Sequence, residues 1–150
     1  MARWSVAFNS GGTSVKGVGY LLAAASNMRR AKVLDWKFCC SLAPADNAFV
    51  HIIQRCTAVP TGAAKTPNAT DPADTLASTQ QAFDTITVDG TLTANAFAAN
   101  IALNQRASFR WVAAPYDELI IPATASNGFM FGVSAATTTT FAEDCQYEEL

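Results

Sequence analysis

The residue types that do chemistry in proteins are sparse in this chain, and its single histidine sets the first limit. Zinc hydrolases, enzymes of the double-stranded β-helix class and non-haem iron sites use two or more histidines, whereas His51 stands alone. It is followed by Ile52 and Ile53, a setting typical of a structural strand residue. No Gly-x-Ser-x-Gly turn is present to expose a serine nucleophile. These residues predict that the protein is not an enzyme. The weakest alternative is a hydrolase centred on His51 or on the pairs of neighbouring acids described next.

Three pairs of neighbouring carboxylates are the next candidates for acid–base chemistry: Asp117-Glu118, Glu143-Asp144 and Glu148-Glu149. Glycosidases use two acids that flank one bond, but neighbours on a strand face opposite sides of its sheet. We therefore expect a solvated edge or tail that discourages unwanted strand addition, and neither a catalytic dyad nor a calcium site.

The four cysteines do not form a metal motif. Cys39, Cys40, Cys56 and Cys145 lack the paired CxxC spacing that brings two thiolates to one zinc ion. We expect reduced, partly buried thiols, and a bridge from Cys39 or Cys40 to Cys56 stays open if their strands pair. Gly11-Gly12 precedes no Gly-Lys-Ser/Thr, so a phosphate-binding loop is not predicted either. The sequence thus predicts no catalytic, cofactor-binding or metal-binding residue.

Low charge is the main feature of the composition. Charged residues make up 15% of the 150 residues, against roughly 25% in ordinary soluble domains. Weak self-repulsion favours association, and a net charge of −2 without a basic cluster argues against direct nucleic-acid binding. No stretch reaches the roughly 20 apolar residues of a membrane span. The first residues lack the continuous apolar run of a secretory signal, so we expect a chain made in a cytoplasm.

Hydrophobic periodicity predicts a mainly β protein. Residues 33–42 alternate with a period of two, which indicates a half-buried strand, and residues 49–59 are predicted to return as its hairpin partner. Residues 60–70 predict a long exposed loop, and residues 94–105 are ambiguous between loop, helical turn and strand. Other strands are predicted at 2–8, 85–93, 108–113, 118–121, 129–133 and 137–147.

Seven or eight short strands predict an antiparallel β-sandwich or jelly-roll-like fold that forms one domain over residues 1–150. One or two short helices are expected. One is predicted at 72–82, where Asp71-Pro72 looks like a helix start, and residues 18–30 are ambiguous between a short helix and extended structure. The alternative is an α+β layout with both helices on one sheet. An extended N-terminal arm at 1–27 and a C-terminal tail at 144–150 are also predicted.

Aromatic residues supply the candidate contact points. Trp36 and Trp111 alternate with strand residues as core side chains do, whereas others are open to a role at an interface. The candidate interface residues are Trp4, Phe8, Tyr20, Tyr116, Asp144, Tyr147 and Leu150. An alternative from another class is a carbohydrate- or receptor-binding module that stacks sugars on exposed Trp and Tyr.

One stretch of the sequence carries a family resemblance. It comprises Leu103-Asn104-Gln105-Arg106-Ala107, the run 109–115, Glu118-Leu119, the run 121–124 and Asn127-Gly128, with a weaker match at 141–143. This pattern resembles small structural proteins of tailed-bacteriophage virions. The resemblance implies a protein made in the bacterial cytoplasm and built into the particle, as a capsid cement or decoration protein or as a tail- or fibre-associated part. It carries over no catalytic residue.

Low charge and the resemblance together predict a homo-oligomer, a trimer in particular, that clamps neighbouring subunits of the major capsid protein or another virion protein. The predicted contact regions are residues 2–15, 60–71 and 144–150.

Overall fold

The computed structural model describes residues 2–9, 15–26, 29–42, 44–74 and 76–150. Within these ranges the chain forms twelve strands and no helix, so the mainly β prediction is confirmed and the α+β alternative is wrong. The strands are β1 Arg3–Asn9, β2 Gly17–Ala23, β3 Ala31–Leu42, β4 Ala48–Cys56, β5 Thr61–Lys65, β6 Asn68–Ala69, β7 Gln80–Val88, β8 Leu92–Asn104, β9 Phe109–Val112, β10 Leu119–Ile121, β11 Gly128–Val133 and β12 Thr140–Glu149.

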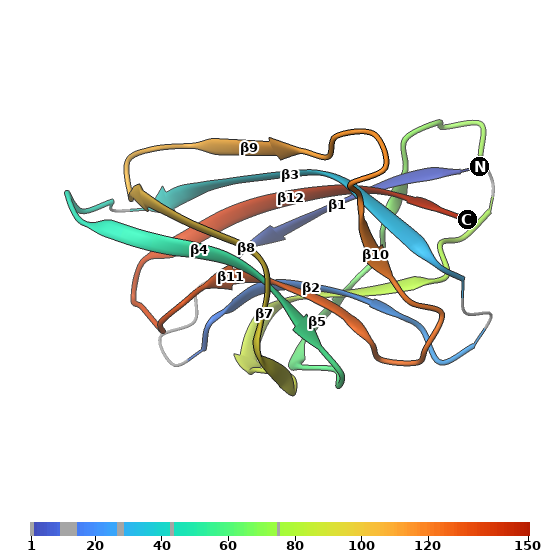
Figure 1. Cartoon of the computed structure of the whole chain (residues 1–150), viewed down its shortest axis with the longest axis horizontal. Helices are drawn as coiled ribbons and strands as arrows, with labels where there is room; N and C mark the ends of the chain where they lie inside the picture. The colour runs from blue at the N-terminus through green and yellow to red at the C-terminus, as the bar shows by residue number, and fades with distance from the viewer. Residues whose placement is uncertain (1, 10–14, 27–28, 43, 75) are drawn as a thin grey trace.

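The strands form two antiparallel sheets that face each other (Figure 1). Sheet A has the order β10-β3-β12-β1-β6, with β9 also paired to β3, and sheet B has the order β5-β7-β2-β11-β4-β8. The pairs β1–β12, β2–β11, β3–β9/β10 and β4–β8 are nested in the sequence and alternate between the sheets. This nesting is the connectivity of a jelly roll. The predicted β-sandwich or jelly-roll-like fold is therefore confirmed.

The main core lies between the two sheets and is rich in aromatic side chains. Every second residue of β1 and β12 points inward, and the rings of Trp4 and Tyr147 stack there with centroids 5.8 Å apart. Phe8 of sheet A stacks on Phe131 of sheet B at the same centroid distance. Burial of each such side chain contributes roughly 1.5–3 kcal/mol, so these contacts hold the two sheets together.

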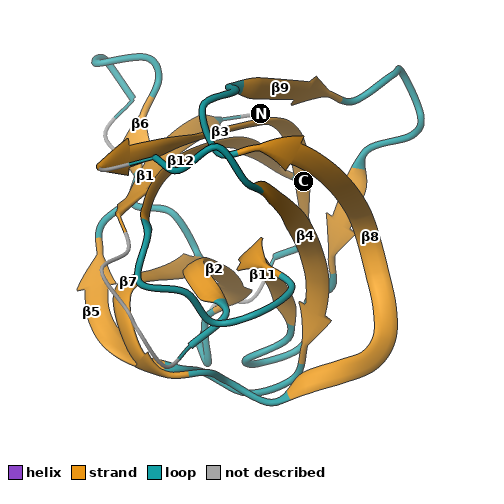
Figure 2. Ribbon diagram, turned by 90° about the vertical axis from the view of Figure 1, so that its left-hand side faces the viewer, coloured by secondary structure: helices purple, strands orange, loops and turns teal. Residues whose placement is uncertain are grey.

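A second, smaller core covers the outer face of sheet B. It contains Tyr20, Leu22, Ile52, Cys56 and Met130, all almost fully buried. The connections 57–60 and 89–91 carry the chain between the two sides of sheet B and run together beneath it (Figure 2).

Hydrogen bonds fasten these two connections to each other and to the sheet. The backbone N–H of Thr57 donates to the carbonyl oxygen of Thr91 at 2.9 Å, and the Tyr20 hydroxyl donates to Asp89 at 2.8 Å. A Cβ at Gly90 would lie 2.2 Å from the carbonyl oxygen of Ala58. Only glycine fits where the two connections cross.

The predicted hairpin of residues 33–42 and 49–59 is wrong, although both segments are strands. β3 lies in sheet A and pairs with β12, β9 and β10, while β4 lies in sheet B and pairs with β11 and β8. Alternation in a sequence identifies a strand but not its partner, and a jelly roll places consecutive strands in opposite sheets. Cys40 and Cys56 therefore lie in different sheets, and all four cysteines are free.

The predicted helix at 72–82 is also wrong, and the described part of 18–30, which the sequence left open between helix and extended structure, contains a strand and no helix. Within 18–30, residues up to Ala23 belong to β2, a central strand buried on both faces, which explains its continuous apolar run. After Asp71-Pro72, the carboxylates of Asp71 and Asp74 accept backbone N–H groups two residues ahead, and β7 begins at Gln80. Such local bonds compete with a helix. The predicted loop at 60–70 contains the short strands β5 and β6.

The described parts of the predicted arm and tail are strands inside the sheets. β1 lies between β12 and β6, and β12 lies between β3 and β1. Residues 1, 10–14 and 27 of the predicted arm lie outside the described residues. Removal of residues 144–150 would take away six of the ten residues of a central strand, so this segment is not a detachable clamp. The described chain contains no helix with the length and hydrophobicity to cross a membrane.

Candidate contact surfaces

The structure divides the predicted interface residues into two groups. Four lie in the interior with at most 2% of their surface exposed: Trp4, Phe8, Tyr20 and Tyr147. These are core residues, because their side chains have no free surface to offer a partner. The other three lie at the surface, with Tyr116 97% and Leu150 46% exposed and Asp144 on the outer face of sheet A.

The aromatic residues do not gather into a sugar-stacking platform. Trp36 is buried, as predicted, and Trp111 of β9 is half-buried beside it in the register of sheet A. Of the aromatic residues considered for stacking, Tyr116 alone is well exposed, at a position with φ 71° between β9 and β10. A platform needs neighbouring exposed rings, and these residues do not supply them.

His51 is a buried strand residue, as predicted. Its ring stacks on Phe38 with centroids 3.8 Å apart and meets Phe141 edge-on at 5.2 Å. Desolvation by burial lowers the pKa of His51 to about 4. The imidazole is therefore neutral near pH 7 and enclosed by apolar rings, so it cannot reach a substrate as a general base.

The carboxylate pairs of β12 face opposite ways, as predicted. Glu143 points inward, where Trp36 Nε1 donates to its Oε2 at 2.8 Å, and burial raises its pKa to about 8. Asp144 points outward to Lys37. The predicted solvated edge or tail is wrong for these residues, since β12 is central in sheet A.

The last pair, Glu148 and Glu149, repeats this arrangement. Glu148 lies on the outer face beside Arg3, with Arg3 Nε 3.2 Å from its carboxylate. Glu149 is buried and accepts the Ser78 hydroxyl and the Thr79 backbone N–H, each at 2.6 Å. The inner carboxylate thus fastens the segment before β7 to sheet A, which is a structural task.

Charge is concentrated on the outer face of sheet A. Arg110 of β9 donates through Nε to Asp35 at 2.9 Å, and this hydrogen bond raises the pKa of Arg110. Lys32 and Glu118 form a further pair at 3.9 Å between β3 and the segment before β10. Together with Lys37–Asp144 and Arg3–Glu148, these pairs link neighbouring strands across the sheet.

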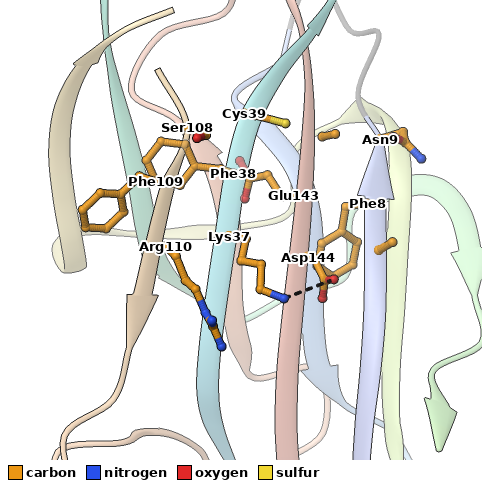
Figure 3. Close-up of a pocket in the computed structure, with 12 residues that line it drawn as sticks. Phe8, Asn9, Lys37, Phe38, Cys39, Ser108, Phe109, Arg110, Glu143 and Asp144 are labelled. Carbon is orange, nitrogen blue, oxygen red and sulfur yellow. Dashed lines mark ion pairs between the residues drawn. The ribbon is translucent and has the colours of Figure 1, made fainter. Parts of the chain in front are cut away.

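A shallow depression of about 410 Å³ lies beside these ion pairs (Figure 3). Strand alternation puts small side chains on this outer face, among them Ala7, Cys39 and Ala142, with Lys37 and Asp144 alongside. The lining also includes Phe8, Asn9, Phe38, Ser108, Phe109, Arg110 and Glu143. The depression fits a small apolar group next to a charged one. Cys39 has no histidine near it, because His51 is enclosed in the core.

No group of three or more metal-ligating side chains occurs among the described residues.

The open edge of sheet B is the surface that sequence reasoning did not find. β8 is thirteen residues long and has β4 as its sole neighbour among the described strands (Figure 2). Residues 90–105 contain no charged residue and no proline, and Phe97 is 44% exposed. Periodicity left this segment ambiguous, but its lack of charge and proline is a sequence signal for an unprotected edge.

No family model, curated protein or solved structure matches the chain.

Proposed function

We propose that this protein is a non-enzymatic structural subunit that acts by assembly. Specifically, it is a capsid cement or decoration protein of a tailed-bacteriophage particle. It stabilises the particle by bridging subunits of the major capsid protein, and it does so as a homo-oligomer, with a trimer as the expected form.

The observation that carries the proposal is the contrast between a closed interior and an open edge. The inward-facing histidine and glutamates are held by core contacts and hydrogen bonds, so they are not available to a substrate. The long uncharged strand β8, in contrast, presents backbone groups and Phe97 to solvent. Monomeric proteins ordinarily protect such edges, so its exposure supports a role in contact with other chains.

The segment that carries the phage resemblance lies on the same side of the molecule as the open edge of β8. Residues 103–128 run from the end of β8 through β9 and β10 to the start of β11. A second depression, of about 370 Å³, lies between residues 96–98 of β8 and residues 118–120 around β10. The resemblance and the open edge therefore coincide on one side of the sandwich, where sheets A and B come together.

The proposal is tested on particles. Tailed-phage particles purified from cells that make this chain are analysed by quantitative mass spectrometry, with the major capsid protein as the internal reference. We expect peptides of this chain at a copy number comparable with that of the capsid subunit. A protein absent from the particles contradicts the proposal, and a few copies per particle assign it to the tail or a fibre.

A further inference from the structure

We propose that two copies of the chain pair antiparallel along β8, around a two-fold axis at Ile101. This inference deepens the proposed assembly function and rests on it, because it names the contact through which copies associate. The two six-stranded sheets B would then join edge to edge into one continuous sheet.

The first step is to establish which backbone groups of β8 face away from β4. Gln105 N–H donates to the carbonyl oxygen of Asn47 at 2.9 Å, which makes these two residues a hydrogen-bonded pair. Residues of β8 alternate from there, so Leu103, Ile101 and Ala99 direct their backbone groups to β4. Asn104, Ala102 and Asn100 direct theirs to the open side.

The β11 side of β4 confirms this alternation. Ser134 N–H donates to the carbonyl oxygen of Val50, so the backbone of Val50 is directed to β11. Val50 is the register partner of Ala102, which therefore receives no hydrogen bond from it. The N–H and C=O of Asn100 and Ala102 are thus directed into solvent.

The open stretch is short and has definite ends. At one end the carbonyl oxygen of Asn104 accepts the N–H of Ala107, so it is already paired. At the other end the β4–β8 register shifts opposite Gln54, and Asn95 has a φ of 58°, which interrupts the regular strand. Pairing with another strand is therefore confined to the few residues around Ile101.

A second copy of the same strand satisfies these groups completely. With the two-fold axis at Ile101, Asn100 of one copy lies opposite Ala102 of the other, and the same pair recurs on the other side of the axis. Each pair exchanges two backbone hydrogen bonds, so the N–H and C=O of Asn100 and of Ala102 are all used in each copy. When a strand pairs antiparallel with a second copy of itself, a charged residue near the axis would lie close to the same charge in the other copy. β8 has no charged residue, so no such repulsion arises.

The side chains fit the same arrangement. Ala99, Ile101 and Leu103 are partly buried against the main core, and across the axis they would meet the equivalent side chains of the second copy. Asn100 and Ala102 on the outer face are small enough to lie side by side. The apolar row of one sandwich would thus continue into the next.

The other edges of the sheets fit a second copy less well. β6 has two residues, β10 has three, and β9 has four, including the ion-paired Arg110. β5 has five residues and carries Lys65. Short strands and lysine are the usual means of preventing edge pairing, and β8 has neither.

The experiment is the molar mass of the purified protein, measured by light scattering after size exclusion over a wide range of concentrations with reductant present. The proposal predicts an even multiple of the chain: two copies, or six if the expected trimer forms as well. Ala102→Pro is the test variant. It removes an N–H that β4 does not use but that the second copy needs, and proline is tolerated at such edge positions.

Ala102→Lys is a second test variant, in case proline perturbs the strand, and Ala64→Lys on the exposed β5 edge is the matched control. We expect both Ala102 variants to halve the mass while the circular dichroism spectrum stays unchanged, and Ala64→Lys to keep the mass of the parent protein. A parent protein with one or three copies, or Ala102 variants that keep the even multiple, would overturn β8 pairing. Neither result bears on whether particles contain the protein, so the two proposals fail separately.

Discussion

The two edges of sheet B differ in how they meet solvent. β5 is short, and its Lys65 binds the buried carboxylate of Asp84 at 2.9 Å, so a charge is fixed at that edge. β8 is more than twice as long and has no charge. Both are end strands of the same sheet, so the fold itself requires neither a short edge strand with a lysine nor a long edge strand without charge. The sequence thus protects the β5 edge from pairing with another strand and leaves the β8 edge able to pair.

The strongest test of this comparison uses the two faces of β8 itself. Ile101→Pro removes an N–H that is directed to His51 and replaces a partly buried side chain, so the free energy of unfolding should fall by about 4 kcal/mol. Ala102→Pro should cost the fold of the single chain about 1 kcal/mol or less, because β4 does not use the N–H of Ala102. Urea denaturation of both variants measures the difference. Equal losses would contradict the assignment of the open side.

The next test changes the stability of the sandwich without touching either edge. The pKa of Glu143 is about 8 in the folded chain and near its ordinary 4.5 in the unfolded chain. The folded state therefore binds this proton more tightly, so the stability that Glu143 contributes is fully present below pH 4.5 and is lost as pH rises through about 8.

Glu143→Gln keeps an acceptor for Trp36 Nε1 and removes this titration. We expect the variant to gain on the order of 3 kcal/mol over the parent protein at pH 8.5, and much less at pH 5. His51 is common to both proteins, so the stability that it loses below pH 6.5 cancels in the difference. A difference that does not change with pH would contradict an ionising Glu143. The molar mass in solution should be the same for Glu143→Gln and the parent protein. An equal mass would show that pairing through β8 does not depend on partial unfolding.

A smaller effect is expected when the lysine that protects the β5 edge is replaced. Lys65→Met leaves the Asp84 carboxylate buried without its cation, and unfolding should become easier by about 2 kcal/mol, since the lysine is itself partly exposed. The double variant Lys65→Met/Asp84→Asn should recover most of this loss in a denaturation experiment. It should also precipitate at lower protein concentration, because the β5 edge then lacks its lysine. Unchanged solubility would mean that length alone protects β5.

The smallest effect is expected at Tyr116, which is almost fully exposed. Tyr116→Ala should change the free energy of unfolding by at most about 0.5 kcal/mol and leave the molar mass unchanged. Loss of binding on a glycan array with this variant would revive the sugar-binding alternative.

The sequence predicted the fold class and most strands, because a period of two and clusters of turn residues are local signals. It could not predict strand partners: β3 and β4 alternate clearly, yet their partners lie far away in the chain. The central strand β2 was ambiguous because burial on both faces removes its alternation.

The contact residues were harder to predict than the fold. Trp4 and Tyr147 were expected at an interface as aromatic residues of the predicted contact regions 2–15 and 144–150, but β1 and β12 pair with each other inside sheet A. The strand β8 stayed ambiguous in the sequence because its register with β4 shifts, which breaks the periodic pattern that a strand usually shows. Its uncharged composition was the one signal visible in advance.

The nested strand order has a consequence for how the protein is made. Arg3 and Glu148 are joined although 145 positions separate them in the chain, and among the described strands β1 has no long partner other than β12. A ribosome releases β1 well before β12, so sheet A closes only after synthesis has passed residue 149. Topologies dominated by distant pairings fold slowly, in milliseconds to seconds. If β8 pairs with a second copy as proposed, that interval would let it meet another nascent chain, so neighbouring ribosomes on one messenger would favour association of copies over isolated folding.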